Sequence, residues 1–307
     1  MSWQRTAERV AGAFPHVPRG ILAFLRSGWA ETYPAEIARA EGAHAFTADG
    51  RRYVDWAMGK GPVILGHARE EVDRAAFERA RRGVLLPGIA PEYEALAARL
   101  SSLVPAMESL AFTKNGSDAV SIAIRLARVH TGREWILSAG YHGWDERVRG
   151  ESLAASAPSR SVADFAYDLG ALEDAVRAAG DRVAAILVTP EPAFFGPELL
   201  RECARLAERS GALLIADEVR CGMRLAPGGA HQAHGVRPDL VTMSKGLANG
   251  WPIAAVGGRR DVMEASAETF VFGTHYAEAA ALAASLEALR IAAEERALER
   301  LREAGGR

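Results

Sequence analysis

The sequence predicts an α/β fold in which a mostly parallel, doubly wound sheet is covered by helices on both faces. Three observations lead to this fold class. From Leu110 onward, short apolar runs alternate with segments of helical periodicity. The run Val183–Val188 is almost continuously apolar, as expected of a strand buried on both faces. The segments between successive runs are long enough to return the chain for parallel pairing.

The individual elements follow from the same patterns. Helical spacing of apolar residues predicts helices over residues 72–80, 93–103, 172–179 and 198–210, and another that begins near Ser117. Apolar runs predict strands over 110–112, 135–138, 183–188, 213–216, 240–243 and 253–256. Residues 150–166 are rich in Ala and Ser and indicate an irregular crossing. A charged helix is expected over 282–301.

The N-terminal part is less regular than the rest of the chain. Residues 37–42 and 45–55 are expected to form two short strands, and Asp49-Gly50 is a strong hairpin-turn signal. We therefore expect a small N-terminal α/β appendage with short strands over 1–60. A large ligand-binding α/β domain is expected over 61–265, and an interface segment with a shortened C-terminal helix over 266–307.

Composition excludes several classes of function. The 307 residues are 49% apolar and 25% charged, with a net charge of −2, so nothing favours nucleic acid or an anionic membrane as a partner. No apolar run approaches the roughly 18 residues that span a bilayer, and no secretory signal is evident, so we expect a cytoplasmic protein. Cys203 and Cys221 provide neither a disulfide framework nor a metal site.

Two chemically complementary residues each follow a predicted strand. Asp217 ends the strand that begins at Leu213, and Lys245 follows the strand that begins at Leu240. Ligands bind at the carboxyl edge of open parallel sheets. A lysine that forms a Schiff base, with an acid for a heterocyclic nitrogen, is the arrangement that holds pyridoxal phosphate. Taken singly, such a lysine is usually a solvated loop residue, and such an aspartate is often a helix cap.

Three further predicted strands end in candidate groups. Gly116-Ser117 begins a helix, where free N–H groups and the helix dipole favour a phosphate, although simple capping by Asn115 or Ser117 is the alternative. Tyr141-His142 lies between glycines and could stack on a ring or merely pack. Glu191 is held between two prolines, or is an exposed loop carboxylate. Complementary groups after five separate strands favour a common site over chance.

Several motifs occur together in an order that resembles a known family. They are 113–119 (TKNGSDA), 141–144 (YHGW), 217–220 (DEVR) with Gly222 and Arg224, and 244–253 (SKGLANGWPI), preceded by 49–55 (DGRRYVD) and 64–68 (ILGHA). The sequence resembles the class III aminotransferases, and within them the glutamate-1-semialdehyde 2,1-aminomutase group. The resemblance covers roughly residues 35–290 and implies a pyridoxal-phosphate-dependent transferase of fold type I.

The resemblance also implies a role for each matching residue. Lys245 would form the Schiff base with the cofactor and later shuttle the proton, and Asp217 would keep the pyridine nitrogen protonated. The turn Asn115-Gly116-Ser117 would bind the cofactor, with the phosphate on Gly116 and Ser117. The remaining implied roles are ring stacking by Tyr141, packing on the other ring face by Val219, lining of the site by His142 and Glu191, and contact with the phosphate of a partner subunit by Thr274.

The implied function is amino-group transfer between a small amino compound and a keto or aldehyde acceptor, in a homodimer with shared active sites. The alternatives are a glutamate-1-semialdehyde-type 2,1-aminomutase and a shortened paralogue that binds the cofactor with little turnover. The family usually continues through a C-terminal domain, which we expect to be missing here. His275-Tyr276-Ala277-Glu278 replaces the family's usual glycine-asparagine. Arg52, Arg220 and Arg224 are open candidates for a substrate carboxylate or for salt bridges.

Overall fold

The computed structural model describes residue 16 and residues 36–144 and 161–306, and the chain divides into two compact units. The smaller unit comprises residues 1–58 with 66–68. Within its described part, an antiparallel sheet contains β1 (Arg39–Glu41), β2 (His44–Phe46) and β3 (Arg52–Val54). The prediction of two strands here was wrong, because the expected strand over 45–55 turns at Asp49-Gly50, where Gly50 has φ +83°, and so divides into β2 and β3.

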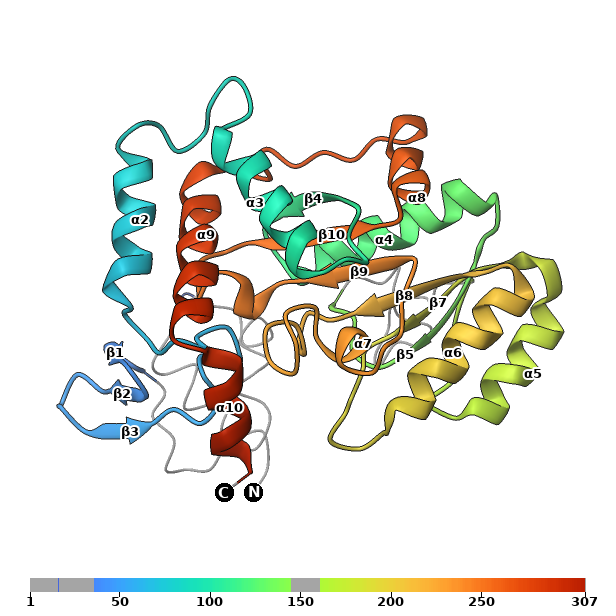
Figure 1. The fold of residues 1–307 in the computed structure, drawn as a ribbon, viewed down its shortest axis with the longest axis horizontal. Coiled ribbons are helices and arrows are strands. Elements are labelled where there is room, and N and C mark those ends of the chain that lie inside the picture. Colours follow the sequence, from blue (N-terminus) through green and yellow to red (C-terminus); the bar gives the residue numbers. More distant parts are fainter. Residues whose placement is uncertain (1–15, 17–35, 145–160, 307) are drawn as a thin grey trace. The chain divides into compact units, whose positions relative to one another are not determined.

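The larger unit comprises residues 59–65 and 69–307 and contains the alternating elements that the sequence predicts (Figure 1). Its strands are β4 (Ser109–Thr113), β5 (Trp135–Ala139), β6 (Val162–Asp164), β7 (Val183–Val188), β8 (Leu213–Asp217), β9 (Leu240–Met243) and β10 (Ala254–Gly258). Its α-helices are α2 (Glu70–Ala80), α3 (Pro91–Leu103), α4 (Gly116–Thr131), α5 (Leu169–Ala179), α6 (Pro197–Ser210), α7 (Ala230–Ala233), α8 (Arg260–Glu264), α9 (Ala279–Glu294) and α10 (Ala297–Gly305).

The strands of the larger unit form one sheet in the described residues, with the order β4-β10-β9-β8-β7-β5-β6. β10 is antiparallel to both of its neighbours, and every other pair is parallel. All strands except β10 therefore run in one direction and end at one edge, which confirms the mostly parallel sheet. β6 lies within the segment expected to be irregular; its three residues pair only with β5 at the sheet edge, too short a run to detect from the sequence.

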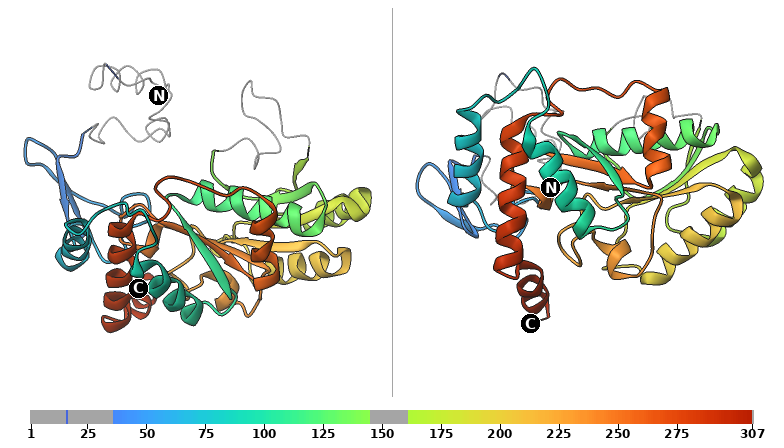
Figure 2. Two further views of the ribbon diagram at one scale, coloured as in Figure 1. Left: turned by 90° about the horizontal axis from the view of Figure 1, so that it is seen from above. Right: turned by 45° about the horizontal axis from the view of Figure 1, so that its top comes forward.

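Helices cover both faces of this sheet, and the alternation of side chains along each strand assigns residues to a face. In β8, Leu213 and Ile215 pack with α4, whereas Leu214 packs with α5 and α6. The view along the sheet shows α4 and the pair α6 and α9 on opposite sides of the strands (Figure 2). Because side chains alternate, Asp217 projects to the α4 face, together with Leu213 and Ile215.

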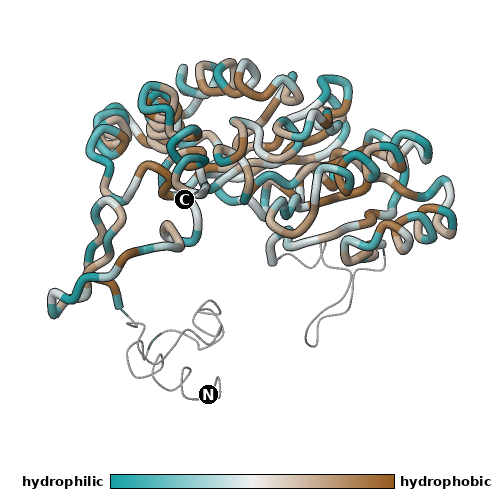
Figure 3. The backbone as a smooth tube through the Cα atoms, turned by 60° about the horizontal axis from the view of Figure 1, so that its bottom comes forward, coloured by the Kyte–Doolittle hydropathy of each residue, from teal (hydrophilic) through white to brown (hydrophobic). Residues whose placement is uncertain are grey.

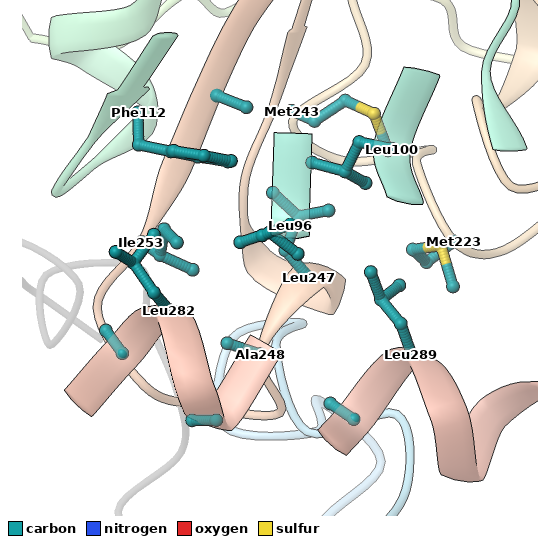
Figure 4. Close-up of a cluster of buried hydrophobic side chains, with 14 of the residues drawn as sticks. Leu96, Leu100, Phe112, Met223, Met243, Leu247, Ala248, Ile253, Leu282 and Leu289 are labelled. Atoms are coloured by element: carbon teal, nitrogen blue, oxygen red, sulfur yellow. The ribbon is translucent and has the colours of Figure 1, made fainter. Parts of the chain in front are cut away.

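The α9 face carries a cluster of buried apolar side chains. Leu96 and Leu100 of α3 meet Phe112 and Met243 of the sheet and Leu289 of α9 (Figure 4). The tube coloured by hydropathy shows hydrophobic and hydrophilic residues alternating along the helical coils (Figure 3). α9 packs against α2 and α3 and contributes its buried apolar side chains to this cluster.

The expected continuous helix over 282–301 was wrong. The chain breaks between α9 and α10 at Arg296, which has φ +51°. Neither glycine nor proline marks this point. The neighbouring Glu295 forms ion pairs with Arg69 and Arg300, and Ala297 is buried, so tertiary contacts fix a break that local propensity does not encode. None of the helices in the described residues has the length and apolarity needed to cross a bilayer.

The close approach of β10 to β4 predicts a cost for any side chain at Gly257. An added Cβ would lie 2.7 Å from both Leu110 Cβ and Met107 Cε, so Gly257→Ala should lower the free energy of unfolding by about 1–3 kcal/mol. Urea denaturation measures this change. Gly88→Ala is the matched control, because no neighbouring atom lies within 4 Å of its added Cβ. Equal stability of the two variants would contradict the packing argument.

Candidate functional site

A cavity of about 170 Å³ opens at the carboxyl edge of the sheet, where the strands that share one direction end. Most of the residues that the sequence singles out line it. The lining residues are Gly116, Ser117, Val120, Tyr141, His142, Gly143, Thr189, Asp217, Val219, Arg220 and Lys245. The fold therefore gathers loops that follow β4, β5, β7, β8 and β9 around one volume.

Asp217 lies at the end of β8 and is almost fully buried. Its Oδ1 accepts hydrogen bonds from the Thr242 hydroxyl (3.0 Å) and the Val219 backbone N–H (3.2 Å). Its Oδ2 lies 2.9 Å from His142 Nδ1 and 3.3 Å from Thr189 Oγ1. These contacts fix the orientation of the carboxylate.

His142 connects this carboxylate to the cavity. If Nδ1 carries the hydrogen that it donates to Asp217, Nε2 is left to face another group. Nε2 is buried and has no hydrogen-bond partner among the described residues. Thr189 Oγ1 also lies 3.0 Å from the Tyr141 carbonyl, which holds the Tyr141-His142 turn against the end of β7. An unpaired, buried ring nitrogen in a cavity wall indicates that a ligand completes it.

Lys245 follows β9 at the start of a short 3₁₀ turn, Lys245–Leu247, and its backbone has φ +36°. Such a conformation is strained for a residue with a side chain and persists where the surroundings enforce it. The backbone of Gly61 leaves only enough room for the Lys245 side chain, since a Cβ on Gly61 would lie 3.1 Å from Lys245 Cδ. Desolvation lowers the pKa of the Lys245 amine; the Asp217 charge opposes this shift, and Arg220 and Arg224 reinforce it.

The N-terminus of α4 forms another wall. Asn115 caps the helix by accepting a hydrogen bond from the Asp118 N–H at 2.9 Å, while Gly116 and Ser117 line the cavity. Capping and an anion seat are therefore compatible here, because they use different groups. A Cβ on Gly116 would lie 2.8 Å from Val219 Cγ1, and one on Gly143 would overlap Ser117 Oγ. Both glycines are required by this close packing.

The remaining predicted site residues lie in different surroundings. Tyr141 lines the cavity with its side chain well exposed, and Val219 forms part of the wall next to Asp217. Glu191 does not line the cavity, but its carboxylate forms an ion pair with Arg220, which lines it. Thr274 is exposed on the segment that precedes α9 and does not line the cavity of its own chain.

Sequence reasoning did not assign Thr189 or Thr242 to the site. Each binds the Asp217 carboxylate from a neighbouring strand, Thr242 from within β9 and Thr189 from just beyond β7. A threonine in or after a strand is too common to be noticed alone. The useful signal is their place near the carboxyl ends of the two strands that flank β8, which depends on the sheet order.

A larger hollow of about 910 Å³ lies at the opposite edge, near the starts of β8 and β9. It is rich in arginine, but those guanidiniums are engaged: Arg133 binds backbone carbonyls, Arg205 binds Glu202 and Arg259 binds Asp239. The described residues that line this hollow include no lysine. The described residues also contain no cluster of His, Cys, Asp and Glu able to hold a metal ion.

The chain matches known proteins over most of its length. The family model described as aminotransferase class-III matches residues 27–166 and 163–307. The chain is 36% identical to 2'-deamino-2'-hydroxyneamine transaminase of Streptomyces kanamyceticus, covering 94% of this chain and 73% of that protein. It is also 36% identical to glutamate-1-semialdehyde 2,1-aminomutase of Syntrophobacter fumaroxidans, covering 95% and 73%.

Solved structures show the same fold. The FumI protein of Sphingopyxis sp. MTA144, in its internal aldimine form with PLP, aligns with a TM-score of 0.81 at 30% identity, over 94% of this chain and 72% of that one. An omega-transaminase from Sphaerobacter thermophilus aligns with a TM-score of 0.81 at 28% identity, over 94% and 72%.

The surroundings of Lys245 predict an amine that becomes neutral at lower pH than an ordinary lysine. In the cofactor-free protein, we expect pH-dependent acylation followed by mass spectrometry to give Lys245 a pKa below 10.5. Since the Arg220 charge contributes to the lowering, Arg220→Gln should raise this pKa. Arg177→Gln, which removes an exposed charge on α5, should leave it unchanged. A Lys245 pKa at or above 10.5 would contradict this electrostatic account.

Proposed function

We propose that this chain, which belongs to the class III aminotransferase family, uses pyridoxal 5'-phosphate to move an amino group between a small amino compound and a keto or aldehyde acceptor. One observation supports this proposal above all. Lys245 and Asp217, an amine with a lowered pKa and a buried carboxylate, line a single cavity together with the N-terminus of α4. An amine, an acid and an anion seat are the groups that this cofactor needs.

The cavity residues fit the cofactor chemically. The free N–H groups at the start of α4 and the Ser117 hydroxyl suit its phosphate, because a helix N-terminus stabilises anions. The Asp217 carboxylate, held by donors on both oxygens, suits a protonated ring nitrogen. Val219 and Tyr141 offer an apolar and an aromatic surface for the ring. The unpaired His142 Nε2 is available to a ligand.

When bound, the cofactor supplies a delocalised ring that accepts the electron pair released at the substrate carbon. The protein residues hold and activate the reactants. Lys245 Nζ would attach the cofactor through its aldehyde carbon and, once released by the substrate amine, would take the proton from the substrate carbon and return it to a different position. Its lowered pKa favours the neutral amine that both tasks require.

Asp217 and His142 have the supporting role in this proposal. An anionic Asp217 would keep the ring nitrogen protonated and so preserve the electron-withdrawing power of the ring. His142 Nδ1 and Thr242 Oγ1 keep the carboxylate aimed into the cavity. Water is excluded from this end of the cavity, since Asp217, His142 and Thr242 are all buried. Their charges and dipoles therefore act with little screening.

An aminomutase is the second candidate, because the glutamate-1-semialdehyde 2,1-aminomutase of S. fumaroxidans is as similar in sequence as the transaminase of S. kanamyceticus. The same residues would serve either reaction. A mutase returns the amino group to the adjacent carbon of the same molecule, whereas a transferase releases a keto or aldehyde product. Detection of that released product separates the two.

We also propose a homodimer whose active sites are shared. The segment that precedes α9 exposes Phe270 and Phe272, which a second copy could cover, and it carries the exposed Thr274. Thr274 would contact the phosphate in the partner's cavity, at the N-terminus of α4. Thr274 would then have a function in the dimer although it does not line the cavity of its own chain.

The role of Lys245 is tested by Lys245→Arg, which keeps the charge but cannot hold the cofactor aldehyde. We expect the variant to lose the visible absorbance of the bound cofactor and to turn over amino donors at least ~10³-fold more slowly, measured by release of keto product. Lys114→Arg is the matched control, since Lys114 pairs with Glu278 and lies outside the cavity. Retained absorbance and turnover in Lys245→Arg would falsify the assignment.

The shared phosphate site predicts similar effects from two residues that are distant in one chain. Light scattering should give about twice the chain mass of 32.8 kDa. Ser117→Ala and Thr274→Ala should each weaken cofactor binding by about 10- to 100-fold, the loss of one hydrogen bond to a charged group, measured by equilibrium titration. A monomer, or an unchanged affinity in Thr274→Ala, would exclude the shared site and leave the Ser117 assignment standing.

A further inference from the structure

The structure separates the arginines that the sequence leaves open as partners for a substrate carboxylate. Arg52 lies in β3 and is not among the described residues that line the cavity. The Arg224 guanidinium donates to the backbone carbonyls of Arg220 and Gly61, and Arg224 does not line the cavity. Arg220 does line it, beside Val219, Asp217 and Lys245. Of these residues, Arg220 is therefore the one placed to meet a molecule that reacts at Lys245.

The Arg220 guanidinium still has donors to offer. Its Nη1 donates to the Glu191 carboxylate, and no described residue accepts a hydrogen bond from Nε or Nη2. The side chain is 54% exposed and Arg220 lines the cavity, so these donors are accessible from solvent at the site. A guanidinium presents five N–H donors in a planar fork, and one edge of that fork can bind a carboxylate through two parallel hydrogen bonds.

Glu191 acts in this arrangement as a fixed support for the guanidinium. It lies between Pro190 and Pro192, and its backbone carbonyl accepts from the N–H groups of Phe194 (2.9 Å) and Phe195 (3.0 Å). Its side chain is 15% exposed, less than a third of the value for Arg220. A carboxylate on a loop held this firmly restricts the orientation of Arg220 without using its remaining donors.

Among the described residues that line the cavity, no acid is free to pair with the remaining donors of Arg220. Both oxygens of Asp217 are engaged by Thr242, Val219 and His142, and Glu191 contacts only Nη1. The rim therefore presents a cationic fork together with the Lys245 amine. A molecule with an anionic carboxylate near its amino group complements both.

We propose that Arg220 binds the carboxylate of the amino donor, so that donors are amino acids and not amines that lack a carboxylate. This inference rests on the proposed function, because it assigns a substrate class to the same cavity. A carboxylate held at Arg220 anchors the donor at a second point, in addition to its amino group, which would react beside Lys245. Two-point binding orients the reacting carbon.

The test uses the cofactor-loaded enzyme and pairs of donors that differ only in the carboxylate. L-alanine is paired with ethylamine, L-phenylalanine with 2-phenylethylamine, and the other proteinogenic amino acids with their decarboxylated amines. Stopped-flow absorbance of the cofactor gives the rate at saturation and the half-saturating concentration for each donor. The wild-type protein should react faster with the carboxylate member of its best pair.

Arg220→Gln should slow that carboxylate donor by about 10- to 100-fold at low concentration, mainly through a higher half-saturating concentration. The matching amine should slow less than the carboxylate donor, because it loses only the contribution of the Arg220 charge to the lowered pKa of Lys245. Arg220→Lys keeps a positive charge but loses the planar fork, so it should slow the carboxylate donor less than Arg220→Gln does. Arg177→Gln, an exposed arginine on α5, is the matched control and should change neither donor.

The outcomes distinguish this inference from the proposed function. If Arg220→Gln slows both members of a pair equally, or no longer holds the cofactor, Arg220 acts on Lys245 or on the cofactor and the inference is overturned. It is also overturned if the wild type shows no preference for the carboxylate. If no donor of either kind alters the cofactor absorbance of the wild type, the proposed function fails and this inference fails with it.

Discussion

The common direction of the strands that carry the site is the constraint on which the rest of the structure depends. β4, β5, β7, β8 and β9 all end at one edge, although they are spread over more than a hundred residues of sequence. The loops that follow these strands therefore converge at that edge. β10 runs the other way between β4 and β9, which keeps β4 parallel to the others while joining it to the sheet.

Successive side chains at the end of β8 point to opposite faces of the sheet, so the adjacent acids Asp217 and Glu218 have different roles. Asp217 projects toward α4 and into the cavity. The next residue, Glu218, is also buried, and it accepts hydrogen bonds from the N–H groups of Ala230 (2.9 Å) and His231 (2.7 Å). One carboxylate thus faces a ligand site while its neighbour anchors the loop at the start of α7. Neither could exchange tasks without reversing the pleat of β8.

Electrostatic balance links the site residues to one another. Desolvation and the charges of Arg220 and Arg224 destabilise the protonated form of Lys245, whereas the charge of Asp217 stabilises it. Glu191 restrains Arg220 at the rim, while Thr242 and His142 hold Asp217 at the base. Two cationic side chains, Arg220 and Lys245, and one carboxylate, Asp217, therefore line the same cavity. The N-terminus of α4 suits an anionic group of a ligand, and Asp217 suits a protonated ring nitrogen.

The sequence by itself determined the order of the elements, the parallel class of the sheet and the chemistry of the residues after each strand, because these depend on apolar periodicity and on local turn residues. It indicated Lys245, Asp217, Ser117 and Tyr141 for one site. Only the tertiary structure decided which partners complete them. Thr189 and Thr242 contact Asp217 through the neighbouring strands, Glu191 pairs with Arg220 instead of lining the cavity, and the helix after Ala279 breaks at Arg296. Those outcomes depend on sheet order and on long-range packing, which no local pattern encodes.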